Sequence, residues 1–130
     1  MIEHLMLIDD NDIDHTLYRR LIDKSGLVEN VHCFTMATDA LEYLKERVHP
    51  KIDVILLDIN MPRMNGFEFL DEATRLFGSD FARITVVMLT TSLSEQDRVR
   101  ADRYEVVRDY IHKPLELSHL EQMDAMLNDG

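Results

Sequence analysis

The sequence predicts an α/β domain built on a single doubly wound parallel sheet of five strands in (βα)5 order. Short apolar segments alternate along the chain with longer segments of helical periodicity, and each apolar segment ends in polar turn residues. Strands that alternate with helices form parallel sheets with right-handed crossovers, and continuous apolar strands are typical of a sheet covered on both faces. The predicted strands are Leu5–Ile8, Val31–Phe34, Val54–Leu57, Ile84–Leu89 and Tyr110–Ile111.

The segment after the first predicted strand repeats apolar residues every four positions. Ile13, Leu17 and Leu21 form this stripe, which indicates an amphipathic helix. Gly26 is expected to end it, because glycine adopts the left-handed conformation that commonly terminates a helix.

The remaining helices are predicted from their caps and periodicity. Thr38 is expected to cap a helix that carries Val48 and ends before Pro50, because a proline disfavours helical geometry in the residue before it. Ser92 and Glu95 fit the capping-box pattern at the start of another helix. Two further amphipathic helices are predicted over 66–77 and 117–127, and the connection 77–83 is expected to be a loop.

Length and charge limit the possible classes of protein. The chain has 130 residues, of which 45% are hydrophobic, so we expect one domain over 1–130 with its core at about 4–127 and no output domain. Its 14 Lys and Arg against 25 Asp and Glu give a net charge of -11, which disfavours direct binding of nucleic acid. No apolar run approaches the length that spans a membrane, and Cys33 is the only cysteine. We therefore expect a cytoplasmic protein without membrane contact.

Polar residues follow several of the predicted strands. Asp9 and Asp10 follow the first strand, Asp58 follows the third, Thr90 follows the fourth and Lys113 follows the fifth. The carboxyl ends of parallel strands meet at one edge of the sheet, where sites in such folds lie. Three carboxylates there favour a divalent cation such as Mg²⁺, which binds oxygen ligands.

Each of these residues also has an ordinary structural explanation. Any one of Asp9, Asp10, Asn11 and Asp12 can cap the following helix, and Asp58 can start a turn. Thr90 competes for its position with Thr91 and Ser92, and a lysine at a sheet edge usually faces solvent. The coincidence of their positions indicates a site more strongly than any single residue does. A cis bond before Pro114 is one way in which Lys113 could be oriented toward that site.

Four motifs resemble those of the receiver domain of two-component response regulators. They cover essentially the whole chain in the family's order, and the resemblance implies a stand-alone, chemotaxis-type receiver with a flavodoxin-like fold. The pair Arg108-Asp109 departs from the pattern, because many receivers have small residues at this point. The motifs are Ile8-Asp9-Asp10-Asn11, the segment from Leu57 to Gly66, Leu89-Thr90-Thr91 and Tyr110-Ile111-His112-Lys113-Pro114.

The resemblance implies a metal-dependent phosphoacceptor site. Asp58 would accept the phosphoryl group. Asp10 would bind Mg²⁺ directly, Asp9 would act largely through water, and Asn60 would contribute its backbone carbonyl. Lys113 would pair with the phosphoryl group.

The same resemblance implies a conformational switch and a set of partners. Thr90 would be the switch hydroxyl and Tyr110 the aromatic residue that follows it. The phosphodonor would be a sensor histidine kinase or a histidine phosphotransfer protein, and the signal would pass to a downstream effector protein through the surface of the last two helices and the last strand. The protein would be a monomer or a phosphorylation-dependent dimer, and not a turnover enzyme.

Three other classes remain as alternatives. A phosphatase with an aspartyl-phosphate intermediate commonly has a second aspartate two residues after the nucleophile, where this chain has Asn60. A flavin- or nucleotide-binding domain needs a phosphate cradle after the first strand, where residues 9–12 are mostly acidic. A pseudo-receiver would use the same fold for protein contacts alone.

Overall fold

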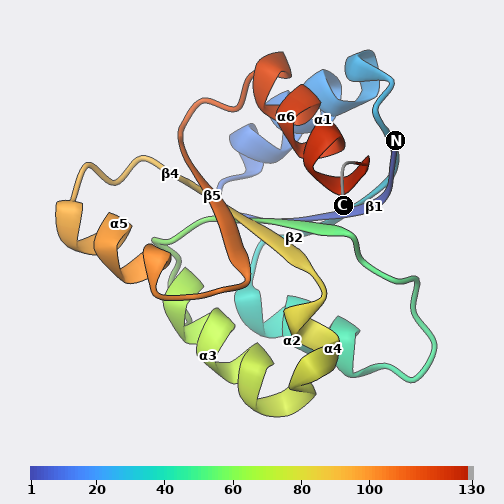
Figure 1. Ribbon diagram of the computed structural model, residues 1–130. Coiled ribbons are helices and arrows are strands. Elements are labelled where there is room, and N and C mark those ends of the chain that lie inside the picture. The colour runs from blue at the N-terminus through green and yellow to red at the C-terminus, as the bar shows by residue number, and fades with distance from the viewer. Residues whose placement is uncertain (129–130) are drawn as a thin grey trace.

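A sheet of parallel strands in the order β2-β1-β3-β4-β5 organises the computed structural model, which describes residues 1–128 (Figure 1). This confirms the predicted fold class. The edge strands β2 and β5 extend beyond the predicted runs and include polar residues, because a strand at the edge of a sheet is partly exposed to water. The strands are β1 (Ile2–Ile8), β2 (Val28–Phe34), β3 (Val54–Leu57), β4 (Thr85–Thr90) and β5 (Val107–His112).

Helices cover both faces of the sheet (Figure 1). The first and last helices pack on one face, and the other four lie on the opposite side. None of the helices within residues 1–128 is long and apolar enough to cross a membrane. The helices are α1 (Asp12–Ser25), α2 (Ala37–Lys45), α3 (Gly66–Phe77), α4 (Ser79–Ala82), α5 (Glu95–Asp102) and α6 (Leu117–Asn128).

The central strand β3 shows why an uninterrupted apolar run is needed. Ile55 and Leu57 pack against the side of α2 and α3, whereas Val54 and Leu56 pack against the side of α1 and α6. Successive side chains of a strand point to opposite faces, so all four are buried when both faces are covered. Each such side chain stabilises the fold by about 1.5–3 kcal/mol relative to exposure.

The predicted apolar stripe of the first helix was mostly wrong, because only Leu21 of its three residues packs against the core. Ile13 and Leu17 are 70% and 53% exposed, and the helix instead buries His15, Tyr18 and Ile22. These three residues also have helical spacing, but two of them are polar enough to be discounted in an apolar pattern. The face that meets the sheet is set by the direction in which α1 leaves β1, which a pattern within the helix does not specify.

The predicted ends of the helices were only partly correct. Gly26 ends α1 in the left-handed conformation, with φ of 67°, as predicted. Helix α2 starts one residue before Thr38, after the extended Met36, and ends at Lys45, so Val48 lies outside it. These two predictions for α2 were therefore wrong.

Two further predictions at helix ends need correction. Ser94, and not Ser92, caps α5 by accepting a hydrogen bond from the backbone N–H of Asp97. The Ser92 hydroxyl instead donates to the Asp97 carboxylate. The connection predicted as a loop contains the short helix α4, whose Phe81 is buried in the core. The helices predicted over 66–77 and 117–127 are confirmed.

The turn after β3 folds back onto itself at Gly66. The Gly66 N–H donates to the carbonyl of Ile59 at 2.9 Å. A Cβ atom at Gly66 would lie 2.5 Å from the carbonyl oxygen of Asp58, a distance that real contacts do not allow. Asn65 caps α3 beside it, in a capping box with Glu68. Glycine is therefore required here for close backbone approach, and this packing fixes the backbone of Asp58.

We expect Gly66→Ala to lower the free energy of unfolding by about 3 kcal/mol, because the new methyl group overpacks against backbone that cannot move aside. Gly26→Ala is the matched control. Its Cβ meets no described atom within 4 Å and introduces only the strain of a positive φ, so its cost should be about 1 kcal/mol. Urea denaturation of both variants measures the difference. An equal loss of stability would contradict the close approach at Gly66.

Candidate functional site

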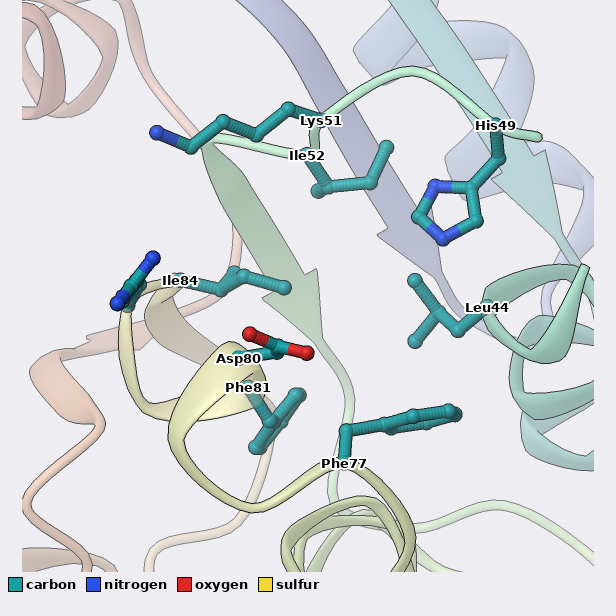
Figure 2. Close-up of a pocket in the computed structure, with 9 residues that line it drawn as sticks. Leu44, His49, Lys51, Ile52, Phe77, Asp80, Phe81 and Ile84 are labelled. Atoms are coloured by element: carbon teal, nitrogen blue, oxygen red, sulfur yellow. The ribbon is translucent and has the colours of Figure 1, made fainter. Parts of the chain in front are cut away.

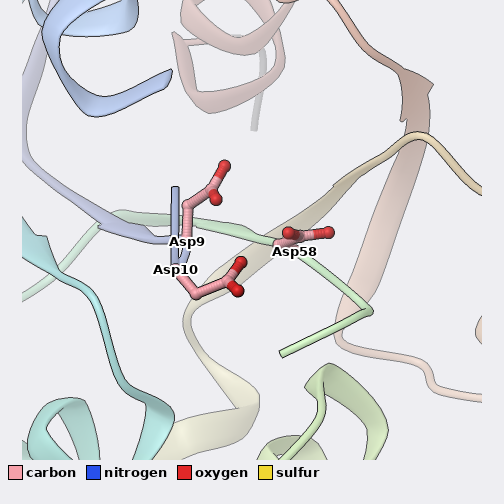
Figure 3. Close-up of side chains that lie close together, drawn as sticks. All are labelled: Asp9, Asp10 and Asp58. Carbon is pink, nitrogen blue, oxygen red and sulfur yellow. The ribbon is translucent and has the colours of Figure 1, made fainter. Parts of the chain in front are cut away.

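The three carboxylates predicted to cluster do lie together at the carboxyl edge of the sheet (Figure 3). Ile8 pairs with Leu57 in neighbouring strands, so Asp9 and Asp58 follow at the same level. The N–H of Asp58 donates to the carbonyl of Ile8 at 3.0 Å, which ties the two strand ends together. One carboxylate oxygen from each of Asp9, Asp10 and Asp58 lies within 4.8 Å of the others. The group has the spacing and the oxygen ligands to hold a metal ion.

Burial makes this cluster electrostatically costly. Asp9 and Asp58 are only 1% and 7% exposed, whereas Asp10 faces solvent. Burial raises the pKa of Asp58 to about 6, with a further upward contribution from the charge of Asp9, against an opposing effect of Lys113. Burial likewise raises the pKa of Asp9 despite its bond to Lys113. The negative charge at this edge is therefore incompletely balanced by the protein itself.

Lys113 supplies the positive charge of the site. Its Nζ donates to Asp9 at 2.8 Å, to Asp14 at 2.8 Å and, more weakly, to Asp58 at 3.4 Å. Burial alone would lower the pKa of Lys113, but its bonds to Asp14 and Asp9 and the charge of Asp58 raise it above the ordinary value. Lys113 is thus charged and held inside the cluster, not facing solvent. The Lys113–Pro114 bond is cis, the geometry considered for it from the sequence.

Asp14 is a residue of this cluster that sequence reasoning missed. It lies in the first turn of α1, where the side chain of Asn11 accepts a hydrogen bond from its backbone N–H. Its carboxylate contacts Lys113 as closely as Asp9 does. The only available signal was an acidic residue one helical turn beyond Asp10, and acidic residues are common in the first turn of any helix.

His15 is a second missed neighbour. It is buried, and its Nε2 lies 2.6 Å from the backbone carbonyl of Asp9. Its Nδ1 has no hydrogen-bond partner among residues 1–128. The ring therefore contacts the backbone at the end of β1, a contact that sequence spacing did not predict.

Thr90 and Tyr110 lie where the parallel arrangement predicted. Thr90 is fully buried at the end of β4, and its carbonyl accepts a hydrogen bond from the N–H of Lys113 at 2.8 Å. Its hydroxyl oxygen accepts a bond from the N–H of Ser92. Tyr110 is half-buried on β5 beneath the guanidinium of Arg98, and its buried hydroxyl has no hydrogen-bond partner in the described chain. Burial raises the pKa of this hydroxyl.

Asn60 lies two residues beyond Asp58, exposed in the turn that leads to Gly66. All the residues singled out from the sequence are therefore on the carboxyl edge of the sheet or in the strands that lead to it. The arrangement combines clustered carboxylates with one buried ammonium group, which suits a divalent cation together with an anionic group such as phosphate.

A family model for the response regulator receiver domain matches residues 5–124. Among curated proteins, the chain is 30% identical to response regulator Rcp1 of Synechocystis sp., over 92% of this chain and 82% of Rcp1. It is 28% identical to protein PilH of Pseudomonas aeruginosa, over 95% of this chain and 96% of PilH. It is 35% identical to a protein-glutamate methylesterase/protein-glutamine glutaminase of Burkholderia thailandensis, but it spans only 29% of that protein's length.

Solved structures agree with these relatives. A two-component response regulator from Cytophaga hutchinsonii superposes with a TM-score of 0.87 at 28% identity, covering 99% of this chain and 98% of the other. A two-component response regulator from Legionella pneumophila covers all of both chains, with a TM-score of 0.79 and 31% identity. The motifs, the fold and these relatives agree: the chain belongs to the response regulator receiver domain family, which acts in two-component signalling.

Proposed function

We propose that this receiver accepts a phosphoryl group on Asp58 in a Mg²⁺-dependent reaction and signals through a conformational switch. The observation that supports it most directly is the position of Lys113, whose ammonium group lies between Asp9 and Asp58 at the carboxyl edge of the sheet. A buried cation beside a carboxylate nucleophile is suited to pair with an incoming phosphoryl oxygen.

The donor set fits Mg²⁺. Asp9, Asp10 and Asp58 offer carboxylate oxygens, and the backbone carbonyl of Asn60 would complete the protein's share of the ligands. When bound, Mg²⁺ supplies positive charge that offsets both the carboxylates and the phosphoryl oxygens. The raised pKa values of Asp9 and Asp58 support this, because they report negative charge that the protein alone leaves partly uncompensated.

The proposed reaction is transfer from a phosphohistidine. A carboxylate oxygen of Asp58 forms a bond to phosphorus while the phosphorus–nitrogen bond of the donor breaks, and the leaving imidazole keeps that electron pair and takes up a proton. Lys113 neutralises a phosphoryl oxygen, and the Thr90 hydroxyl donates to another. The work of the chain is to position the nucleophile and to balance charge.

The switch would run from Thr90 to Tyr110. The Thr90 hydroxyl now accepts the Ser92 N–H, so donating to a phosphoryl oxygen would move or redirect it. Tyr110 leaves its buried hydroxyl without a partner within residues 1–128, which supports a second ring position in which that hydroxyl is satisfied. Phosphorylation would bias such a pair of positions through local charge.

Response regulators of two-component systems receive their signal from histidine kinases. The phosphodonor proposed here is a sensor histidine kinase or a histidine phosphotransfer protein, and the receiver of the signal is an effector protein in the cytoplasm. The surface of α5, β5 and α6 is the proposed exit. The register between β4 and β5 shifts so that Val87 pairs with Asp109, and Arg108 becomes the extra residue of a bulge. A bulge changes the direction of neighbouring side chains, so the Arg108-Asp109 pair gives this surface a distinct shape.

Incubation with Mg²⁺ and acetyl phosphate should add one phosphoryl group, detected by intact mass spectrometry. Asp58→Asn and addition of EDTA should each abolish the adduct, because the first removes the nucleophile and the second the metal. Asp39→Asn, which removes an exposed carboxylate of α2, is the matched control and should label as the wild type does. Labelling that survives in Asp58→Asn would place the acceptor elsewhere. No labelling of folded wild-type protein would favour a pseudo-receiver.

Asp58→Asn should raise the free energy of unfolding in EDTA at pH 7.5 by about 1–2 kcal/mol, after allowance for solvent screening. Folding raises the pKa of this group from 3.8 to about 6. Its charged form therefore opposes folding once the pH exceeds about 4, and does so fully above about pH 6. Asparagine removes that opposition, so the two proteins should differ little below pH 4.

Mg²⁺ should then stabilise the wild type more than Asp58→Asn, since it binds the folded carboxylate cluster and the variant has lost one ligand. Urea denaturation of both proteins, with EDTA and with Mg²⁺, measures both effects. An Asp58→Asn variant that is less stable than the wild type in EDTA would show that Lys113 already balances the charge of Asp58.

A further inference from the structure

A pair of histidines meets on the sheet away from the acidic cluster. His4, near the start of β1, places its Nδ1 3.0 Å from the Nε2 of His32 on β2. Both rings are half-buried, so a small ion from solvent can reach them. We propose that His4 and His32 form a binding site for a divalent transition metal such as Zn²⁺, with water completing its coordination. The inference does not depend on the proposed phosphorylation of Asp58.

The two rings are close enough for a metal to bridge them after they turn. With Zn–N bonds of about 2.1 Å at a tetrahedral angle, two imidazole nitrogens lie about 3.4 Å apart and their ring centres about 5.3 Å apart. The ring centres of His4 and His32 are already 5.3 Å apart, and the rings are tilted by 31°. Because the nitrogens are 3.0 Å apart along nearly the same line, they point at each other, as in a hydrogen bond. A bridging metal therefore requires the nitrogens to open by about 0.4 Å and each ring to turn by roughly 35°, so that both nitrogens face one point.

The backbone holds the first ligand in place. The N–H of His4 donates to the carboxylate of Asp53 at 3.0 Å, and the carbonyl of His4 accepts from the N–H of Asp53 at 2.9 Å. These two bonds fix His4 against the residue that leads into β3. The Asp53 carboxylate also places a negative charge beside the pair, which favours a bound cation.

Aromatic neighbours hold the second ligand. The ring of His32 lies between His4 and Tyr43, with its centre 5.6 Å from that of Tyr43. Tyr43 is in turn flanked by Phe34 at 5.3 Å and by His49 at 5.5 Å. A ligand ring supported in this way loses little freedom when a metal binds, which is a requirement for affinity with few ligands.

His49 is not part of the proposed site. Its Nδ1 is hydrogen-bonded to the carbonyl oxygen of Pro50, and its ring lines a separate cavity (Figure 2). This cavity of about 340 Å³ lies between the end of α2 and α4 and mixes apolar residues with Lys51, Asp80 and Arg83. His49 nevertheless affects His32, because burial, then the charge of His4 and then that of His49 lower the pKa of His32.

The protonation state of His32 favours binding of a metal ion. A lowered pKa leaves His32 neutral at pH 7, and a neutral imidazole is the form that binds metal. Two protonated rings at this distance would repel each other, and the 3.0 Å separation lets one ring donate an N–H to the other when no metal is bound. Imidazole ligands prefer Zn²⁺, Ni²⁺ or Cu²⁺ to Mg²⁺, so excess Mg²⁺ can occupy the acidic cluster without filling this site.

The test is calorimetric titration of the full chain with ZnCl₂ at pH 7.5 in excess Mg²⁺. We expect one Zn²⁺ to bind with a dissociation constant on the order of 10 µM, because the protein supplies half of a four-ligand set. His4→Gln and His32→Gln should each weaken binding at least tenfold. His119→Gln, which removes a histidine of α6, should leave it unchanged.

Two further measurements separate loss of a ligand from loss of structure. His32→Cys restores a zinc ligand and should bind Zn²⁺ where His32→Gln does not. In the wild type, Zn²⁺ should shift the ring nitrogen resonances of His4 and His32 and not those of His119. Equal binding by the wild type and both Gln variants would place the metal elsewhere, and absence of binding at millimolar Zn²⁺ would reject the site.

Discussion

The ion pairs between the ammonium group of Lys113 and the carboxylates around it are the interactions on which this molecule depends most. This ammonium group comes from the end of β5 and reaches Asp9 and Asp14 at 2.8 Å and Asp58 at 3.4 Å. One positive charge faces three carboxylates in direct contact, and Asp10 adds a fourth nearby. A buried charge is tolerated only when it is paired, so the cluster is held together by Lys113 and still carries an excess of negative charge. That excess supports the proposal that the site binds a cation and that Asp58 acts as the nucleophile.

The geometry of the cluster follows from the sheet. Because β1 and β3 are neighbours in the centre, Asp9 and Asp58 lie side by side although 48 residues separate them. The hydrogen bonds of the strand ends place the carboxylates, and the close approach at Gly66 fixes the turn that follows. A rigid scaffold thus carries the charges, and Thr90 and Tyr110 on the neighbouring strands β4 and β5 are the residues proposed to respond to a change of charge.

The buried polar side chains described in this fold are concentrated near the carboxyl edge of the sheet. Asp9, His15, Asp58 and Thr90 are the buried polar or charged residues among those described, and all lie at or beneath the carboxyl edge. The histidine pair lies elsewhere, on β1 and the edge strand β2, half-buried and facing the side of α2. The two groups differ in chemistry, since oxygen ligands suit Mg²⁺ and imidazole nitrogen suits transition metals.

The sequence by itself determined the fold class and the main site, because both depend on local signals: apolar runs of strand length, helical periodicity, and polar residues directly after Ile8, Leu57 and Leu89. Tertiary structure alone decided which face of α1 is buried and which remote side chains meet. Asp14 reaches Lys113, and His4 reaches His32, across gaps in sequence that no spacing rule relates. Strand order and the direction of each crossover set those contacts, and they arise from packing of the whole chain.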